Sequence, residues 1–220
     1  MGEPSQIALP LATRAPAGAQ RIVVGNANAA VIEALQAPDR WPFHVAVLTG
    51  PARSGKSLLG RWAQILHGAG IEVIDDAETL DETALFHRWN AVQQGGTRAR
   101  HEGGGALLLI VNADPEHGGW RITLPDLASR IGGSLQLAIT APDDAMAGDL
   151  ILAHAERRGL TLPDGAADYL VPRTERSFAA IEALVAAIDR ISLERQTPAT
   201  MSVWRAALEA LHGPEQQRLL

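Results

Sequence analysis

The chain has 220 residues, 46% of them hydrophobic, which is enough for one substantial core or for one core with a small helical appendage. Its formal net charge of −6 includes no basic block, so the chain lacks the electrostatic surface expected of a duplex-DNA binder. With no membrane span, no signal peptide and no cysteine, it is expected in the cytoplasm, without disulfides or thiolate metal sites.

The first predicted feature is a leader, residues 1–20, which carries the string QIALPL from Gln6 onward. Its apolar residues alternate as in a strand, but Pro10 has no N–H for a ladder and tolerates only an edge. The alternative is an extended peptide that another protein binds, with the Gln6 amide in a polar pocket and Leu9 and Leu11 in an apolar one. Pro10 then lowers the entropy that the peptide loses on ordering.

The next feature is a phosphate loop with the sequence GPARSGKS. A glycine turn and a helix within Val23–Leu35 are followed by a buried strand over His44–Leu48, then the loop, then an amphipathic helix through Leu66. This strand–loop–helix context is the one that the G-x-x-x-x-G-K-[ST] motif requires. The loop N–H groups and the helix N-terminus form an anion cradle, Lys56 reaches the β- and γ-phosphates, and Ser57 offers a hydroxyl to Mg²⁺. The expected nucleotide-binding residues are Gly50, Pro51, Ala52, Arg53, Ser54, Gly55, Lys56, Ser57 and Leu58.

Two acids follow the next predicted strand, Ile71–Ile74. Asp75 and Asp76 stand at its carboxyl end, where open α/β sheets bind ligands. We expect Asp75 to hold Mg²⁺ through water and Asp76 to orient or deprotonate the attacking water. Alternatively, both acids simply begin the helix predicted over Thr79–Gln94, as N-terminal acids do. The phosphate loop just upstream favours the functional interpretation.

The strand–helix alternation continues downstream. A continuous apolar strand within Gly105–Asp114 places Asn112 beside the two acids, where a neutral amide positions water or senses the γ-phosphate. A short helix over Leu124–Ile131 carries Arg130, and a strand over Ser134–Thr140 follows. The pattern predicts one parallel sheet with crossover helices.

Only helices are predicted after Thr140, which is a candidate cap for the first of them. They span Pro142–Arg157, a segment opened by Pro163, Glu175–Arg195 and Thr200–Leu211. The third carries a core-facing apolar stripe made of Phe178, Ile181, Val185, Ile188 and Ile191. Arg176 precedes a face of small residues on this helix, from which a guanidinium can reach into the expected cleft between the two domains. The expected domains are the leader 1–20, an α/β nucleotide-binding domain 21–141 and a helical lid 142–220.

The chain resembles the AAA+ module of the DnaA family of bacterial replication initiators, most closely its Hda/HdaA regulatory inactivators, in the ordered strings GPARSGKS, IDDAETLDETALFHRWNAVQQGG, VNADP and LPDLASRI. The resemblance spans about Ile22 to Leu211. It implies an AAA+ P-loop NTPase fold, a parallel sheet with flanking helices followed by an all-helical lid. The loading domain and the DNA-binding helix-turn-helix domain of DnaA are expected to be absent, so no direct sequence-specific DNA binding is expected. QIALPL is similar to the peptide by which the Hda group docks on the DNA polymerase III sliding clamp (its beta subunit), which makes Gln6, Leu9, Pro10 and Leu11 partner-binding residues.

The resemblance also implies cofactors and residue roles. ADP or ATP with Mg²⁺ is the implied cofactor, and Walker A, Walker B and first-sensor roles pass to Lys56 with Ser57, Asp75 with Asp76, and Asn112. Arg130 matches an arginine finger that faces nucleotide on a neighbouring subunit, a task suited to a planar guanidinium. Its alternative is a surface arginine on a short helix. Arg176 matches a second sensor placed one turn early, with alanine at the strictly aligned position.

Two departures from the family pattern qualify these roles. Between Ser57 and Asp75 there is room for one helix and one strand only, so the sheet is expected to have one strand fewer than usual. The acidic strand is then short and near the sheet edge, which places hydrolysis by the chain itself in doubt. The extra Gly-rich, mildly basic segment Thr97–Gly105 is interpreted as a surface loop, with partner contact as the alternative.

Three functions are compatible with these features. The first is a clamp-docked regulator that promotes hydrolysis of DnaA-bound ATP through Arg130 and so negatively regulates replication initiation. The second is a nucleotide-binding clamp adaptor of the DnaA family without useful hydrolysis. The third is an independent P-loop enzyme such as a small-molecule kinase, which requires an acceptor pocket in the lid. DnaA and the clamp are the implied partners, no membrane is expected, and pairing of the chain with itself is left open.

Overall fold

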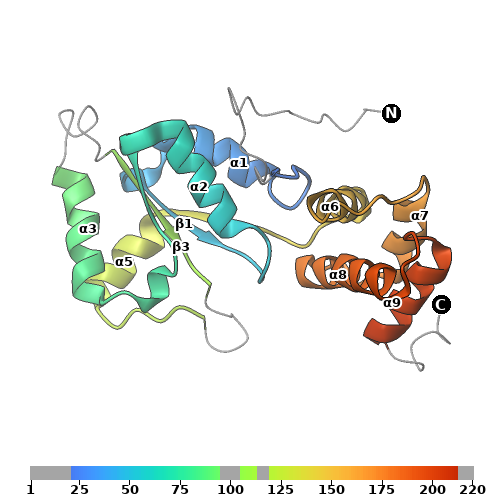
Figure 1. Ribbon diagram of the computed structural model, residues 1–220. Coiled ribbons are helices and arrows are strands. Elements are labelled where there is room, and N and C mark those ends of the chain that lie inside the picture. Colours follow the sequence, from blue (N-terminus) through green and yellow to red (C-terminus); the bar gives the residue numbers. More distant parts are fainter. Residues whose placement is uncertain (1–20, 95–104, 113–118, 213–220) are drawn as a thin grey trace. The chain divides into compact units, whose positions relative to one another are not determined.

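The computed structural model describes residues 21–94, 105–112 and 119–212 (Figure 1). The QIALPL peptide with Gln6, Leu9, Pro10 and Leu11, almost all of the Thr97–Gly105 segment and Asp114 lie outside the described residues. Contacts divide the chain into two compact units, Asn28–Thr140 and the remaining described residues, 21–27 with 141–212.

A four-stranded sheet forms the centre of the first unit. Its strands are β1 (Val45–Thr49), β2 (Ile71–Ile74), β3 (Ala106–Ile110) and β4 (Leu135–Ala138). All pairings are parallel, and the order is β2-β3-β1-β4. β3 is buried along its whole length, as a strand covered on both faces requires. The predicted parallel sheet is confirmed, with the strand that precedes the two acids at its edge.

Helices cover both faces of this sheet (Figure 1). The unit contains α1 (Ala29–Gln36), α2 (Lys56–His67), α3 (Glu82–Gln94) and α5 (Pro125–Gly133). α2 lies close to one face because Gly60 has no side chain, and a Cβ there would come within 2.6 Å of Ile110 Cδ1. Residues of α3 and α5 join the opposite face in one buried cluster that includes Val47, Leu85 and Leu127.

α3 begins later than predicted, at Glu82 instead of Thr79. A 3₁₀ turn over Ala77–Thr79 intervenes, and the Thr79 N–H and hydroxyl both donate to the Asp76 carbonyl oxygen, at 2.9 and 2.8 Å. The Asp81 carboxylate then accepts the Ala84 N–H at 3.0 Å, which satisfies an open donor of the first helical turn. Asp75 and Asp76 therefore do not lie in the first turn of this helix.

The second unit is a helical lid. It contains α6 (Asp144–Arg157), α7 (Ala166–Leu170), α8 (Phe178–Arg195) and α9 (Met201–His212). The caps of α6 and α8 are Asp143 and Ser177, which accept the backbone N–H groups of Met146 and Ala180; Asp143 takes the place expected for Thr140. The predicted apolar stripe of α8 is buried. Within the described ranges, no helix has the length and apolarity needed to cross a bilayer.

Residues 21–27, which the sequence pattern assigned to the first domain, contact the lid. The Asn26 amide donates to the Ala141 carbonyl at 3.2 Å and accepts the Asp143 N–H at 3.0 Å. Gly25 lies so close to Met146 that a Cβ at this position would be 2.8 Å from the thioether sulfur. The segment before α1 is thereby tied to the start of α6.

Candidate functional site

The loop Gly50–Ser57 connects β1 to α2 at the carboxyl end of the sheet. Gly55 caps α2 with φ 86°, and Arg53 has φ 64°, a left-handed conformation that is unfavourable for a residue with a side chain. Such conformations cost about 1–3 kcal/mol each and concentrate at ligand clamps and active sites. The loop backbone is therefore held in a shape that its local preferences do not favour.

Lys56 is the only lysine in the chain and the first residue of α2, and its side chain is 5% exposed. Its Nζ donates to the carbonyl oxygens of Gly50 and Pro51, both at 2.9 Å. An ammonium has three donors, so one remains for a ligand. Burial lowers the pKa of Lys56, and nearby carboxylates, Asp75 foremost, partly offset this by raising it. The loop thus holds its cation in place before any phosphate arrives.

The carboxyl ends of β2 and β3 bring the acids and the amide together. Asn112 Nδ2 donates to Asp76 Oδ1 at 2.7 Å and to Asp75 Oδ1 at 3.4 Å. Asp76 has φ 53°, a left-handed conformation that aspartate tolerates better than most residues. Both carboxylates and the amide are exposed, so a ligand on the phosphate loop can approach them.

Glu78 is a further residue of this site that the sequence pattern did not single out. Its Oε1 accepts the Asn112 backbone N–H at 3.0 Å. Its Oε2 is buried and finds no hydrogen-bond partner within the described part of the chain. Glu78 also lies close enough to Lys56 to raise the pKa of that ammonium. In the sequence, Glu78 is visible as the third acid of the string DDAE. Its position could not be predicted because the conformation of the turn that carries it was not known.

The residues available for Mg²⁺ are few. Ser57 lies in the first turn of α2 and is partly buried, and Asp75 stands at the end of β2. Among the described residues, no group of three or more acids or histidines converges as a metal site. Mg²⁺ bound with a nucleotide needs only one or two protein oxygens because phosphates and waters complete its octahedron. Ser57 and Asp75 fit that requirement. Leu58, which was also expected to contact the nucleotide, is partly buried in α2.

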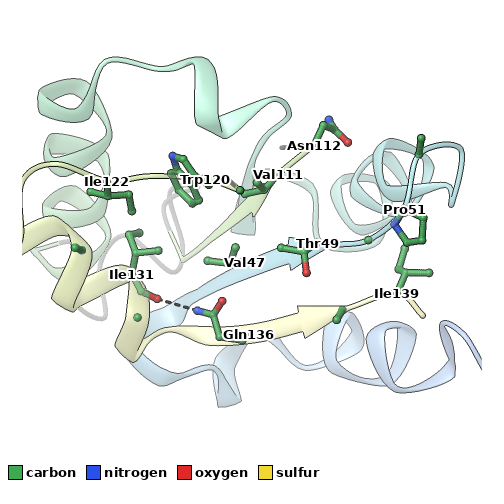
Figure 2. Close-up of a pocket in the computed structure, with 16 residues that line it drawn as sticks. Val47, Thr49, Pro51, Val111, Asn112, Trp120, Ile122, Ile131, Gln136 and Ile139 are labelled. Carbon is green, nitrogen blue, oxygen red and sulfur yellow. Dashed lines mark hydrogen bonds between the residues drawn. The ribbon is translucent and has the colours of Figure 1, made fainter. Parts of the chain in front are cut away.

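A cavity of about 970 Å³ adjoins the loop on the sheet face that α5 covers (Figure 2). Figure 2 shows Val47, Thr49 and Val111 on its floor, with Trp120 and Ile131 around it. Its lining is mainly apolar, and two of its polar side chains are already engaged by backbone carbonyls. Thr49 donates to Leu137, and Gln136 donates to Ile131 and Ser134. The cavity offers volume beside the loop but few free polar groups.

Arg130 makes three contacts with α3 and a fourth within its own helix, α5. Its guanidinium carbon lies 4.7 Å from the Phe86 ring centroid and 4.5 Å from that of Trp89. Its nitrogens donate to Asn90 Oδ1 at 2.6 Å and pair with Asp126 at 2.9 Å. The side chain is 28% exposed, so it is neither a free surface arginine nor extended toward solvent. A role on a neighbouring subunit requires these contacts to break.

Arg176 is engaged within the lid. Its Nε lies 2.8 Å from Asp144 Oδ1, and a second guanidinium nitrogen donates to Asp144 Oδ2 at 3.1 Å. Both side chains are more than half exposed, so the pair is weak in energetic terms and easily exchanged for another anion. The structure therefore leaves the second-sensor role of Arg176 a prediction.

Comparison with known proteins relates the lid to one family and the whole fold to several solved structures. The family described as Hda, lid domain, matches residues 144–208, from the start of α6 into α9. Domain III of the replication initiation protein DnaA from Thermotoga maritima superposes with a TM-score of 0.64 at 14% identity, over 88% of this chain and 95% of that one. The replication initiator DnaA bound to AMPPCP and single-stranded DNA gives 0.54 at 17% identity, over 80% and 66%. The FIGL-1 AAA domain in complex with ADP gives 0.58 at 14% identity, over 89% and 85%.

These comparisons agree with the architecture. The structural matches, all below 25% identity, establish the AAA+ fold with its shortened parallel sheet and helical lid. The lid match adds a similarity to the Hda lid family, which extends from the start of α6 into α9. The lid of this chain is thus similar to the Hda lid family, and its fold is the AAA+ fold that domain III of DnaA also has.

Proposed function

We propose that this chain binds ADP or ATP with Mg²⁺, docks on the DNA polymerase III sliding clamp, and promotes hydrolysis of DnaA-bound ATP, so that it restrains replication initiation. The observation that carries the nucleotide part is the buried Lys56 ammonium, held by two loop carbonyls with one donor left over. Related structures contain AMPPCP and ADP, which supports the same conclusion.

The acids and the amide support a phosphate site at the same edge. Asp75, Asp76 and Asn112 are joined by hydrogen bonds at the carboxyl ends of β2 and β3. In parallel α/β sheets this edge is where ligands bind. When bound, Mg²⁺ would neutralise phosphate charge, with Ser57 and Asp75 as the residues to hold it. The exposed carboxylates of this turn are then shielded from the anionic phosphates.

The clamp part of the proposal rests on the leader peptide. Gln6, Leu9 and Leu11 supply one amide and two apolar anchors around Pro10, a composition suited to recognition as an extended segment. Changing Leu9 and Leu11 to alanine should abolish binding to immobilised clamp while the thermal stability of the protein stays nearly constant. Residues of a buried strand would instead cost about 2–5 kcal/mol each on the same change. Unaltered clamp affinity in the double variant would contradict the docking proposal.

The adaptor function, without stimulation of hydrolysis, is the second candidate, and one observation favours it. The Arg130 guanidinium, proposed to act on nucleotide in DnaA, is engaged by Phe86, Trp89 and Asn90 of its own chain. A finger in this position must leave its contacts before it can reach a neighbouring site. An adaptor needs no such release.

One experiment separates the two candidates. Hydrolysis of ATP bound to DnaA is measured with DNA-loaded clamp and either wild type or Arg130→Ala, and nucleotide affinity of the two proteins is measured in parallel. The regulator function predicts that the variant keeps its nucleotide affinity and loses the stimulation, since arginine fingers are worth about 10³–10⁵ in rate. Equal stimulation by both proteins contradicts the role of Arg130, and no stimulation by wild type leaves the adaptor. Arg121→Ala, an exposed arginine ahead of the same helix, is the matched control.

A further inference from the structure

Glu78 connects the two halves of the candidate site. It lies in the 3₁₀ turn that follows Asp75 and Asp76, and its carboxylate reaches across to the end of β3. There its Oε1 accepts the Asn112 N–H at 3.0 Å, while the Asn112 side chain donates back to Asp76 at 2.7 Å. The backbone and the side chain of Asn112 are thus each bound by a different acid of the same turn.

This arrangement fixes a residue that the strand alone does not hold. Asn112 lies beyond β3, which ends at Ile110. Its N–H donates to Glu78 and not to a neighbouring strand. A hydrogen bond to a charged acceptor is worth roughly twice a neutral one, and the Glu78 carboxylate is such an acceptor. The orientation of the Asn112 amide therefore depends on Glu78 as much as on Asp76.

The position of Glu78 also connects it to the phosphate end of the site. Its second oxygen is buried without a partner among the described residues, and its charge acts on the Lys56 ammonium together with those of Asp75 and Asp76. A carboxylate that was needed only to hold a turn together would gain by turning this oxygen to water. Here that oxygen is buried, while the other holds the Asn112 N–H and the charge acts on Lys56.

We propose that Glu78 is a positioning residue that holds Asn112 in the orientation needed to distinguish ATP from ADP. Glu78 acts through its hydrogen bond to the Asn112 backbone. The inference rests on the proposed nucleotide binding at the phosphate loop. It goes beyond that proposal because it adds Glu78 to the residues on which discrimination of the γ-phosphate depends. Those residues were so far the phosphate loop, Asp75, Asp76 and Asn112.

The test compares the ratio of ATP to ADP affinity in four proteins, measured by titration with fluorescent nucleotides at fixed Mg²⁺. Asn112→Ala should lower this ratio about tenfold, the loss typical of one hydrogen bond to a charged group. Glu78→Ala should lower it by a similar factor, whereas Glu78→Gln, which keeps an acceptor for the Asn112 N–H, should stay near wild type. Glu33→Gln, an exposed acid on α1 of the same unit, is the matched control and should change nothing.

The outcomes distinguish the inference from the function on which it rests. If wild type binds neither nucleotide, or Asn112→Ala leaves the ratio unchanged, the proposed site fails and the inference falls with it. If Asn112→Ala lowers the ratio and Glu78→Ala does not, the site stands and the positioning role is wrong. Hydrogen exchange of the Asn112 backbone N–H tests the contact with Glu78 without nucleotide. Protection in wild type and Glu78→Gln but not in Glu78→Ala supports the contact, and equal protection in all three overturns it.

Discussion

Arg130→Ala should lower the free energy of unfolding, because Arg130 joins α5 to α3 through three contacts and makes a fourth within α5. Two of these are with the Phe86 and Trp89 rings, one is with Asn90, and one is with Asp126 on its own helix. Alanine removes all four and leaves the two aromatic faces and the Asn90 amide without their partner. The perturbation is therefore larger than that of an ordinary surface arginine.

The magnitude follows from the exposure of each contact. Cation–π contacts contribute about 0.5–2 kcal/mol depending on desolvation, and the Arg130 side chain is 28% exposed. The hydrogen bond to Asn90 adds about 1 kcal/mol. The i,i+4 pair with Asp126 adds only about 0.3–0.5 kcal/mol because Asp126 is 64% exposed. Since these terms overlap, we expect a loss of about 2 kcal/mol.

Urea unfolding followed by tryptophan fluorescence measures this loss, because the Trp89 ring lies under the guanidinium. Arg121→Ala should change the stability by less than about 0.5 kcal/mol, as exposed substitutions usually do. If Arg130→Ala matches that control, the contacts do not stabilise the fold and the guanidinium is free to move. A finger role would then carry no conformational cost, and the argument for the adaptor function would lose its main support.

Three further predictions concern the phosphate loop, the lid, and two glycines in the helices α2 and α5. Lys56→Ala should weaken ADP and ATP binding at least about tenfold. Since Lys56 is the only lysine, acylation of ε-amines in wild type reports on this group alone. Bound nucleotide should slow this acylation, and an unchanged acylation rate would count against the site. His154 in α6 has a pKa lowered by burial and by Arg157 and Arg158, against an opposing effect of Glu182, so the unfolded chain binds its proton more readily. Lid stability should therefore fall as the pH drops below about 6.5, and His154→Asn should show a shallower pH dependence in thermal melts; parallel profiles would refute this. Gly60→Val should destabilise by about 1–3 kcal/mol through overpacking against Ile110, whereas Gly132→Ala, where a Cβ meets nothing within 4 Å, should stabilise by about 0.5–1 kcal/mol in the same urea assay.

The sheet and the lid could be predicted from the sequence because their signals are local. The apolar run of β3 and the alternation of strands with helices are sufficient for a parallel sheet, and the helical spacing from Phe178 to Ile191 is sufficient for the core face of α8. The start of α3 was wrong because the 3₁₀ turn depends on the Asp76 backbone conformation, which the sequence does not display. Capping of α6 by Asp143 rather than Thr140 was missed for a similar reason.

Side-chain partners across elements lay beyond sequence reasoning. Arg130 and its aromatic contacts on α3 are separated by about forty residues, and no periodicity relates them. The same holds for Glu78 and Asn112, which meet only because β2 and β3 are adjacent in the sheet. Sequence patterns identify which residue types a phosphate site requires, but the pairing of strands decides which of them meet.

The short sheet raises the question of whether an edge position for β2 weakens the site, and the contacts argue that it does not. β2 pairs with β3 along its inner edge, from Ile71 opposite Ala106 to Ile74 opposite Leu109. The hydrogen bonds that join Asp75, Asp76 and Glu78 to Asn112 run toward this inner side, to the end of β3. A further strand beyond β2 would pair with the opposite edge and would add no group to the site. The edge position therefore changes only what borders β2 on the outside and leaves the contacts of the acids with Asn112 unaffected.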